Sequence, residues 1–157
     1  MGDTEEILKQ VDLLIEARTS NADWLRDLCV LLQRERPHYN WVGFYFLEGN
    51  ELVVGPYVGA PTPHTRIPLD QGICGAAVRE RKAVIVPDVG QDPRYLACSL
   101  ETKSEIVVPI EHEGWILGEI DIDSRQLNAF RADDHALLQT VAYRLAPLLA
   151  QEPAGRA

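Results

Sequence analysis

Hydrophobic residues near both ends of the chain recur every three or four positions, which is the spacing of a helix that buries one face. The first such segment covers residues 4–17. A second begins at 20–23 and stops before Pro37, because proline is disfavoured in the interior of a helix. A third covers residues 133–150. The pattern therefore predicts two helices at the N-terminal end of the chain and one at the C-terminal end.

Between these helices the hydrophobic residues alternate with a period of two or form short runs, as they do in strands. The predicted elements are, in chain order, strands over 39–47 and 51–57, an extended piece over 65–69, a short helix over 71–81, and strands over 83–86, 106–111 and 115–122. Tight turns at 48–50 and 112–114 join two pairs of these strands into hairpins. Hairpins imply an antiparallel sheet, and helices at both ends imply that helices cover one of its faces. The predicted fold class is α+β.

The length of 157 residues suits a single domain over 1–157, with its core over about 20–150 and a mobile tail over 151–157. No apolar run reaches the roughly 18 residues that a membrane-spanning helix needs, so no membrane association is expected. The N-terminus lacks the apolar segment of a signal peptide, which favours a cytoplasmic location with reduced thiols. A net charge of −9 argues against a nucleic-acid partner, since nucleic-acid binding normally requires a basic face.

The four histidines and three cysteines do not form the motifs of a metal site, so none is predicted. Cys29 falls on the apolar side of the second helix and is expected in the core. Cys74 stands at the glycine-rich start of the short helix, where the helix N-terminus is expected to lower the pKa of the thiol. Cys98 lies in a long polar loop over 88–103, where a thiol is accessible. Taken alone, Cys74 and Cys98 are either unrelated thiols or a redox pair.

Three carboxylates stand at the ends of two neighbouring strands. Asp121 and Asp123 end the last strand and share one face of it, because residues two apart on a strand point the same way. Glu105 begins the preceding strand, and the two ends are neighbours in a hairpin. The acids then either converge at one edge of the sheet or face water. If they converge, their mutual repulsion raises at least one pKa and leaves a proton to donate.

A series of short motifs runs through roughly residues 20–150. They are Asn40-Trp41-Val42-Gly43-Phe44-Tyr45, Arg66-Ile67-Pro68, Gly72-Ile73-Cys74-Gly75, Ala97-Cys98, Ser104-Glu105-Ile106-Val107-Val108-Pro109 and Asp121-Ile122-Asp123-Ser124. Together they resemble the GAF-domain free methionine-R-sulfoxide reductases. The resemblance implies a GAF-like fold, a central antiparallel sheet flanked by N- and C-terminal helices. It also implies an enzyme that reduces free methionine (R)-sulfoxide to methionine, is recycled by thioredoxin and has no bound cofactor.

The resemblance implies roles for individual residues as well. Cys98 corresponds to the catalytic cysteine, and Cys74 to one of two positions that can resolve it. Trp41 and Tyr45 match the aromatic wall that accepts the substrate methyl group. The residues that match the substrate-binding acids are Glu105, Asp121 and Asp123, and of these Glu105 and Asp123 are also expected to act in catalysis.

At one position the chain departs from the family pattern. The family often carries another resolving cysteine two residues before the Arg-Ile-Pro motif, where this chain has His64. Cys74 is then expected to resolve Cys98, or an external reductant must reduce the sulfenic acid directly. The alternative functions are a non-catalytic GAF module that senses a small molecule and a general thiol peroxidase. A homodimer through the terminal helices is an expectation by analogy with other GAF proteins.

Overall fold

The computed structural model describes residues 3–19, 23–96 and 101–151. The elements are, in chain order, α1 (Thr4–Ala17), α2 (Asp23–Glu35), β1 (Trp41–Glu48), β2 (Glu51–Val58), β3 (Arg66–Pro68), α3 (Gly72–Glu80), β4 (Val84–Val86), the 3-10 helix η1 (Val89–Gln91), β5 (Ser104–His112), β6 (Trp115–Ser124) and α4 (Ala132–Ala150). Three predicted features lie outside the described residues: the start of the second helix at 20–22, the loop cysteine Cys98, and the tail from residue 152 onward. Among the described residues, no helix combines the length and the apolar character that crossing a bilayer requires.

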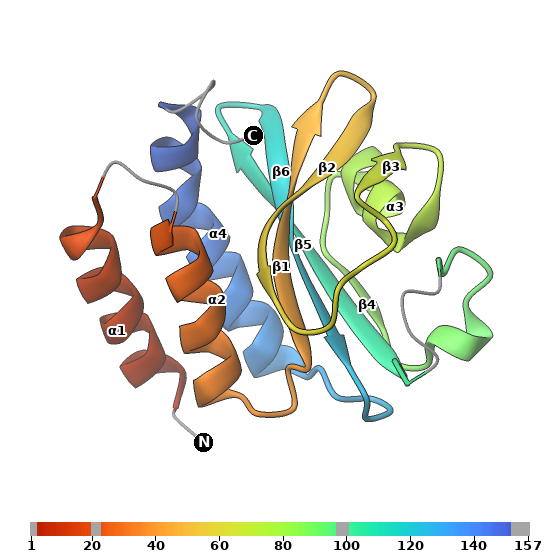
Figure 1. Cartoon of the computed structure of the whole chain (residues 1–157), viewed down its shortest axis with the longest axis horizontal. Helices are drawn as coiled ribbons and strands as arrows, with labels where there is room; N and C mark the ends of the chain where they lie inside the picture. Colours follow the sequence, from red (N-terminus) through yellow and green to blue (C-terminus); the bar gives the residue numbers. More distant parts are fainter. Residues whose placement is uncertain (1–2, 20–22, 97–100, 152–157) are drawn as a thin grey trace.

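The six strands form one antiparallel sheet in the order β3-β2-β1-β6-β5-β4 (Figure 1). Both predicted hairpins are confirmed, and the α+β class with them. The β5–β6 hairpin is longer than predicted, because its pairing continues until Ser104 lies opposite Ser124. Its turn has positive φ at Glu113 and at Gly114, the backbone shape that fits the twist of a two-residue hairpin.

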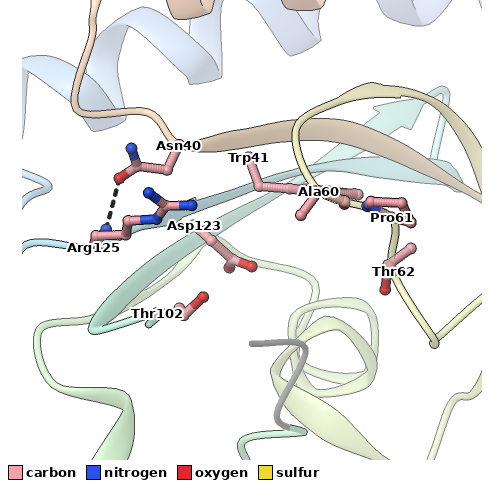
Figure 2. A pocket seen from close by; sticks show the side chains of 8 residues that line it. All are labelled: Asn40, Trp41, Ala60, Pro61, Thr62, Thr102, Asp123 and Arg125. Atoms are coloured by element: carbon pink, nitrogen blue, oxygen red, sulfur yellow. Dashed lines mark hydrogen bonds between the residues drawn. The ribbon is translucent and has the colours of Figure 1, made fainter. Parts of the chain in front are cut away.

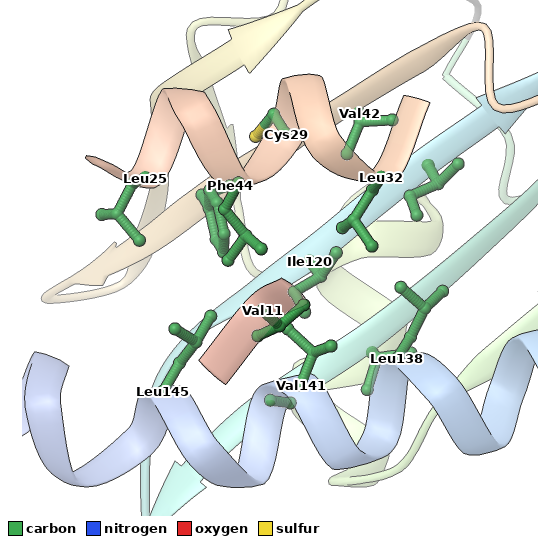
Figure 3. Close-up of a cluster of buried hydrophobic side chains, with 14 of the residues drawn as sticks. Val11, Leu25, Cys29, Leu32, Val42, Phe44, Ile120, Leu138, Val141 and Leu145 are labelled. Atoms are coloured by element: carbon green, nitrogen blue, oxygen red, sulfur yellow. The ribbon is translucent and has the colours of Figure 1, made fainter. Parts of the chain in front are cut away.

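Helices α1, α2 and α4 lie together on one side of the sheet, as predicted (Figure 1). The core on this side is apolar, and β1, β5 and β6 contribute every second residue to it (Figure 3). The sheet residues in this core are Val42, Phe44, Phe46, Val58, Ile106, Val108, Ile110, Ile120 and Ile122. Cys29 is fully buried in the same core, which confirms its predicted place, and burial raises the pKa of its thiol to about 12.

The other side of the sheet is covered by α3 and by the segments around β3 and β4 (Figure 1). Helix α3 begins with glycines that allow a close approach to the neighbouring loops. A Cβ atom on Gly75 would lie 2.6 Å from the carbonyl oxygen of Leu69, so only glycine fits. Gly72 has a φ of +72°, a conformation that other residues rarely adopt. These two glycines let the first turn of α3, which carries Cys74, lie close to the chain at Leu69 and Leu96.

Candidate functional site

The strand register gathers acidic side chains on the face of the sheet that α3 covers. Glu105 of β5 pairs with Asp123 of β6, and Asp121 lies two residues along the same strand. A fourth acid, Glu119, continues this row, because it lies two residues before Asp121. All four are buried, with at most 5% of any of them exposed. The alternative that these carboxylates are solvated charges at strand ends is therefore wrong for this fold.

The predicted convergence is confirmed, but its predicted place at a sheet edge is wrong. Strand β1 pairs with β6 on one side and β4 pairs with β5 on the other, so neither acid-bearing strand is an edge strand. The acids therefore lie on a covered face. Glu119 was missed, although the alternation of Glu119, Asp121 and Asp123 along one strand was a readable signal. Glu119 lies between Gly118 and Ile120, and this apolar surrounding is typical of an ordinary buried strand.

Strand β1 adds an aromatic wall beside the acids. Trp41 lies opposite Asp123 and Tyr45 lies opposite Glu119. Between them Gly43 lies opposite Asp121, and a Cβ atom there would meet the Trp41 ring at 2.5 Å. The rings of Trp41 and Tyr45 are near-parallel, with their centroids 6.3 Å apart. The missing side chain at Gly43 thus lets the Trp41 ring lie flat over the strand beside the acids.

Hydrogen bonds hold both aromatic side chains against the loop that follows β2. The Trp41 indole N–H donates to the carbonyl oxygen of Ala60 at 3.0 Å, and the Tyr45 hydroxyl donates to the carbonyl oxygen of His64 at 2.8 Å. Because their polar groups are occupied at the rim, the rings turn apolar surface toward the site. Such a wall can accept a methyl group or a thioether chain by shape.

Cys74 lies close to the row of acids. Its thiol sulfur donates a hydrogen bond to Asp121 Oδ2 at 3.5 Å. Burial raises the pKa of this thiol well above its ordinary value, and the negative charges of Asp121, Glu119 and Glu105 raise it further. The prediction that the helix N-terminus lowers this pKa is therefore wrong. The sequence could not show that three carboxylates would face the helix end, and their charges together with burial outweigh the partial charge of one helix terminus.

The acids themselves are easier to protonate than ordinary carboxyl groups. Burial raises the pKa of Glu119, Asp121 and Asp123, and the neighbouring charge of Asp121 raises it further at the other two. Among the described residues, no hydrogen bond reaches either side-chain oxygen of Glu119 or Oδ1 of Asp121 and of Asp123. Protonated carboxylic acids in a buried site can donate a proton to a group that gains negative charge there.

Two small hollows open on this face. One lies at the start of β1 and the end of β6, where the Arg125 backbone N–H donates to Asn40 Oδ1 at 2.7 Å (Figure 2). It is lined by Asn40, Trp41, Ala60, Pro61, Thr62, Thr102, Asp123 and Arg125. The other is lined by Tyr45, His64, Ile67, Gly72, Ile73, Cys74, Leu96, Glu105 and Asp121. All the predicted site residues within the described ranges therefore line one hollow or the other.

Cys98 lies outside the described residues. Its flanks are described on both sides. Leu96 lines the hollow that contains Cys74, and Thr102 lines the hollow that contains Asp123. The chain before and after residues 97–100 therefore reaches both parts of the site. His64, which stands where the family often has a cysteine, lines the same hollow as Cys74.

The tertiary structure also forms a group of potential metal ligands. The Cys74 sulfur and one carboxylate oxygen each from Glu105 and Asp121 all lie within 4.8 Å of one another. The sequence motifs did not predict this group, because its members come from α3, β5 and β6 and have no characteristic spacing.

Comparison with known proteins identifies the family. The sequence model of the GAF domain matches residues 4–149. The chain belongs to the GAF domain family. Within it, this GAF chain is a member of the group that includes the free methionine-R-sulfoxide reductases. It is 32% identical over 145 residues to the free methionine-R-sulfoxide reductase of Escherichia coli, covering 92% of this chain and 87% of that protein.

Another relative and a solved structure also match most of the chain. Protein YtsP of Bacillus subtilis is 38% identical over 156 residues, which covers 96% of this chain and 95% of that protein. The crystal structure of free methionine-R-sulfoxide reductase from Neisseria meningitidis, in complex with its substrate, superposes with a TM-score of 0.88. It is 32% identical and covers 96% of this chain and 92% of that one. The GAF fold and the enzyme group predicted from the motifs are therefore confirmed.

Proposed function

We propose that this protein reduces free L-methionine (R)-sulfoxide to L-methionine, with Cys98 as the nucleophile and Cys74 as the resolving thiol. The observation that carries the proposal is the shared face of the sheet. There an aromatic wall of Trp41 and Tyr45 lies directly beside buried acids of raised pKa. The membership of the chain in the reductase group supports the same reaction.

The wall and the acids suit the two ends of the substrate. The apolar rings accept the methyl group, while the acids meet the sulfoxide oxygen and the ammonium. An approaching ammonium stabilises the ionised form of the carboxyl group that it contacts. A peptide-bound methionine sulfoxide has no such ammonium, so the acids would remain without a charged partner. This difference supports a preference for the free amino acid.

In the proposed first step the Cys98 thiolate attacks the sulfoxide sulfur. Glu105 or Asp123 donates a proton to the sulfoxide oxygen as that oxygen gains negative charge. Methionine leaves as a thioether, and the oxygen ends on Cys98 as a sulfenic acid. The substrate sulfur is reduced by two electrons and Cys98 is oxidised by two.

In the proposed second step Cys74 attacks the sulfenic acid of Cys98. A disulfide forms, water leaves, and an external dithiol such as thioredoxin then reduces the disulfide. Because the pKa of Cys74 is raised, its proton must pass to a neighbour before the attack, and Asp121 already accepts a hydrogen bond from this thiol. The reaction requires no bound cofactor in this scheme.

A coupled assay tests the reaction. The protein is supplied with thioredoxin, thioredoxin reductase and NADPH, and separately with free (R)-sulfoxide, free (S)-sulfoxide and N-acetyl-methionine-(R)-sulfoxide amide. Rapid NADPH consumption with the free (R) epimer alone is expected. Equal rates on the blocked compound would contradict the role of the acids. Binding of the free sulfoxide without turnover would instead support the non-catalytic sensor.

Single-turnover measurements without reductant test the roles of the thiols. Cys98→Ser is expected to release no methionine. Cys74→Ser is expected to release about one methionine per chain and then to stop when thioredoxin is the only reductant. Cys29→Ser is the matched control, because this thiol is buried on the opposite side of the sheet. Mass spectrometry should find a Cys74–Cys98 disulfide, and a Cys29–Cys98 disulfide would overturn the assignment.

A further inference from the structure

Cys74, Glu105 and Asp121 form a compact set of one sulfur and two oxygen ligands, all within 4.8 Å of one another. Each comes from a different regular element, α3, β5 or β6, so the backbone holds all three in place. The separation between Cys74 Sγ and Asp121 Oδ2 is 3.5 Å, close to the distance between two ligands of one small metal ion.

A second observation points to a cation at this place. Glu119 is fully buried, and no hydrogen bond reaches either of its oxygens within the part of the chain that the structure describes. The charge of Glu119 raises the pKa of Cys74, and the charge of Asp121 raises the pKa of Glu119. Glu119 therefore lies close to the group formed by Cys74, Glu105 and Asp121. Oδ1 of Asp121 is likewise buried without a hydrogen bond. Three buried carboxyl oxygens at this point, two of Glu119 and one of Asp121, therefore receive no hydrogen bond from the described residues.

We propose that Cys74, Glu105 and Asp121 bind a divalent transition-metal cation of the zinc class, and that its occupancy reversibly inhibits the enzyme. The ligand set determines the class of ion. Thiolate sulfur selects zinc-like ions over Mg²⁺ and Ca²⁺, which prefer oxygen ligands only. Three protein ligands leave a fourth tetrahedral position for a water molecule or for a Glu119 oxygen.

Binding would change the chemistry of the site in a defined way. The Cys74 thiol releases its proton to solvent and becomes a metal-bound thiolate, while the two carboxylates ionise. No electron is transferred. A metal-bound Cys74 is not free to attack a sulfenic acid, and Glu105 and Asp121 are no longer available to the substrate. The inhibitory half of this proposal rests on the proposed function, whereas the binding half does not.

Titration of the reduced protein with Co²⁺ tests the binding half without any turnover. We expect one Co²⁺ per chain and the near-ultraviolet absorption of a thiolate bound to cobalt. Cys74→Ser should abolish this absorption, and Cys29→Ser should keep it at full strength. Absorption that survives in Cys74→Ser, or that disappears in Cys98→Ser alone, would overturn the site.

A pair of acid variants keeps the test independent of the cysteine. Asp121→Asn is expected to weaken Co²⁺ binding at least about 10-fold, because loss of even an outer-shell partner of a metal ligand costs about 10–100-fold. Glu111→Gln is its matched control, because Glu111 lies on β5 with Glu105 but is exposed and pairs with Arg81 at 3.1 Å. Equal affinity in the two variants would exclude Asp121 as a ligand. Circular dichroism confirms that each variant is folded.

The inhibitory half is tested with Zn²⁺ in the single-turnover assay. One equivalent should suppress methionine release, and a chelator should restore it. A protein that binds Co²⁺ as described but reduces no sulfoxide would contradict the proposed function alone. A protein that reduces the sulfoxide and binds no Co²⁺ at Cys74 would contradict the metal site alone.

Discussion

The two faces of the sheet are built from the same strands but have opposite chemistry. On β6 the side chains of Ile120 and Ile122 enter the apolar core beneath the helices, while Asp121 and Asp123 enter the site beneath α3. The two buried thiols show the same contrast. Cys29 is surrounded by apolar side chains, whereas Cys74 faces three carboxylates. A single step along a strand therefore separates a residue that stabilises the fold from one that serves the site.

The two faces also differ in what their burial does to stability. The apolar face gains free energy from every side chain removed from water. On the other face several buried carboxyl oxygens lack a hydrogen bond within the described ranges, which destabilises the folded state. The favourable burial beneath α1, α2 and α4 can offset this cost, because both faces belong to one sheet. Variants on each face should separate stability from activity.

Phe44→Ala should show the largest effect, and on stability alone. Phe44 lies in the centre of the helix-covered core and is almost fully buried (Figure 3). Loss of the ring should lower the free energy of unfolding by about 3–5 kcal/mol. Urea denaturation followed by circular dichroism measures this. Activity per folded molecule should stay within a few-fold of the original, and a loss of a hundredfold would show that the two faces are not separable.

Asp123→Asn should have the opposite effect, a loss of activity and not of stability. It should reduce kcat/KM by at least about 10²-fold, near 2.7 kcal/mol of transition-state stabilisation, through loss of a proton donor and substrate contact. Ile122→Val is the matched control, one residue away on the other face. It should lower the free energy of unfolding by about 0.5–1.5 kcal/mol and leave kcat/KM unchanged. Wild-type activity in Asp123→Asn would show that this acid has no part in the reaction.

Glu119→Leu should stabilise the protein, by about 1–3 kcal/mol, because it removes a buried carboxyl group without a hydrogen bond. The gain should depend on pH. The folded state raises the pKa of Glu119 above its ordinary value of 4.5, so above pH 4.5 the unfolded chain releases a proton that the folded chain retains. Wild-type stability therefore falls as the pH rises. Urea denaturation should show a larger gain at pH 8 than at pH 5, and a gain independent of pH would contradict this origin.

Cys29→Ala should have the smallest effect. It removes a buried sulfur from the apolar core and should lower the free energy of unfolding by about 1 kcal/mol. Turnover should not change, because this thiol lies across the sheet from the acids. A loss of thioredoxin-driven turnover in this variant would place Cys29 in the redox cycle and remove the contrast between the two thiols.

The sequence by itself determined the elements, the α+β class and the family, because hydrophobic periodicity and turn residues act locally and the motifs are short. It also indicated that the strand ends that carry Glu105 and Asp123 are neighbours, since both ends belong to one hairpin, whereas the direct pairing of these two residues belongs to the longer hairpin of the structure.

Only the tertiary structure decided the environment of those residues. Strands β1 and β4 flank the two strands that carry the acids, so these acids do not lie at an edge of the sheet. Helix α3 covers the face on which they lie. The packing of α3 brought Cys74 to Asp121, and so raised a pKa that the helix terminus alone would have lowered. Desolvation and charge depend on which distant segments meet, and no local pattern of residues encodes that.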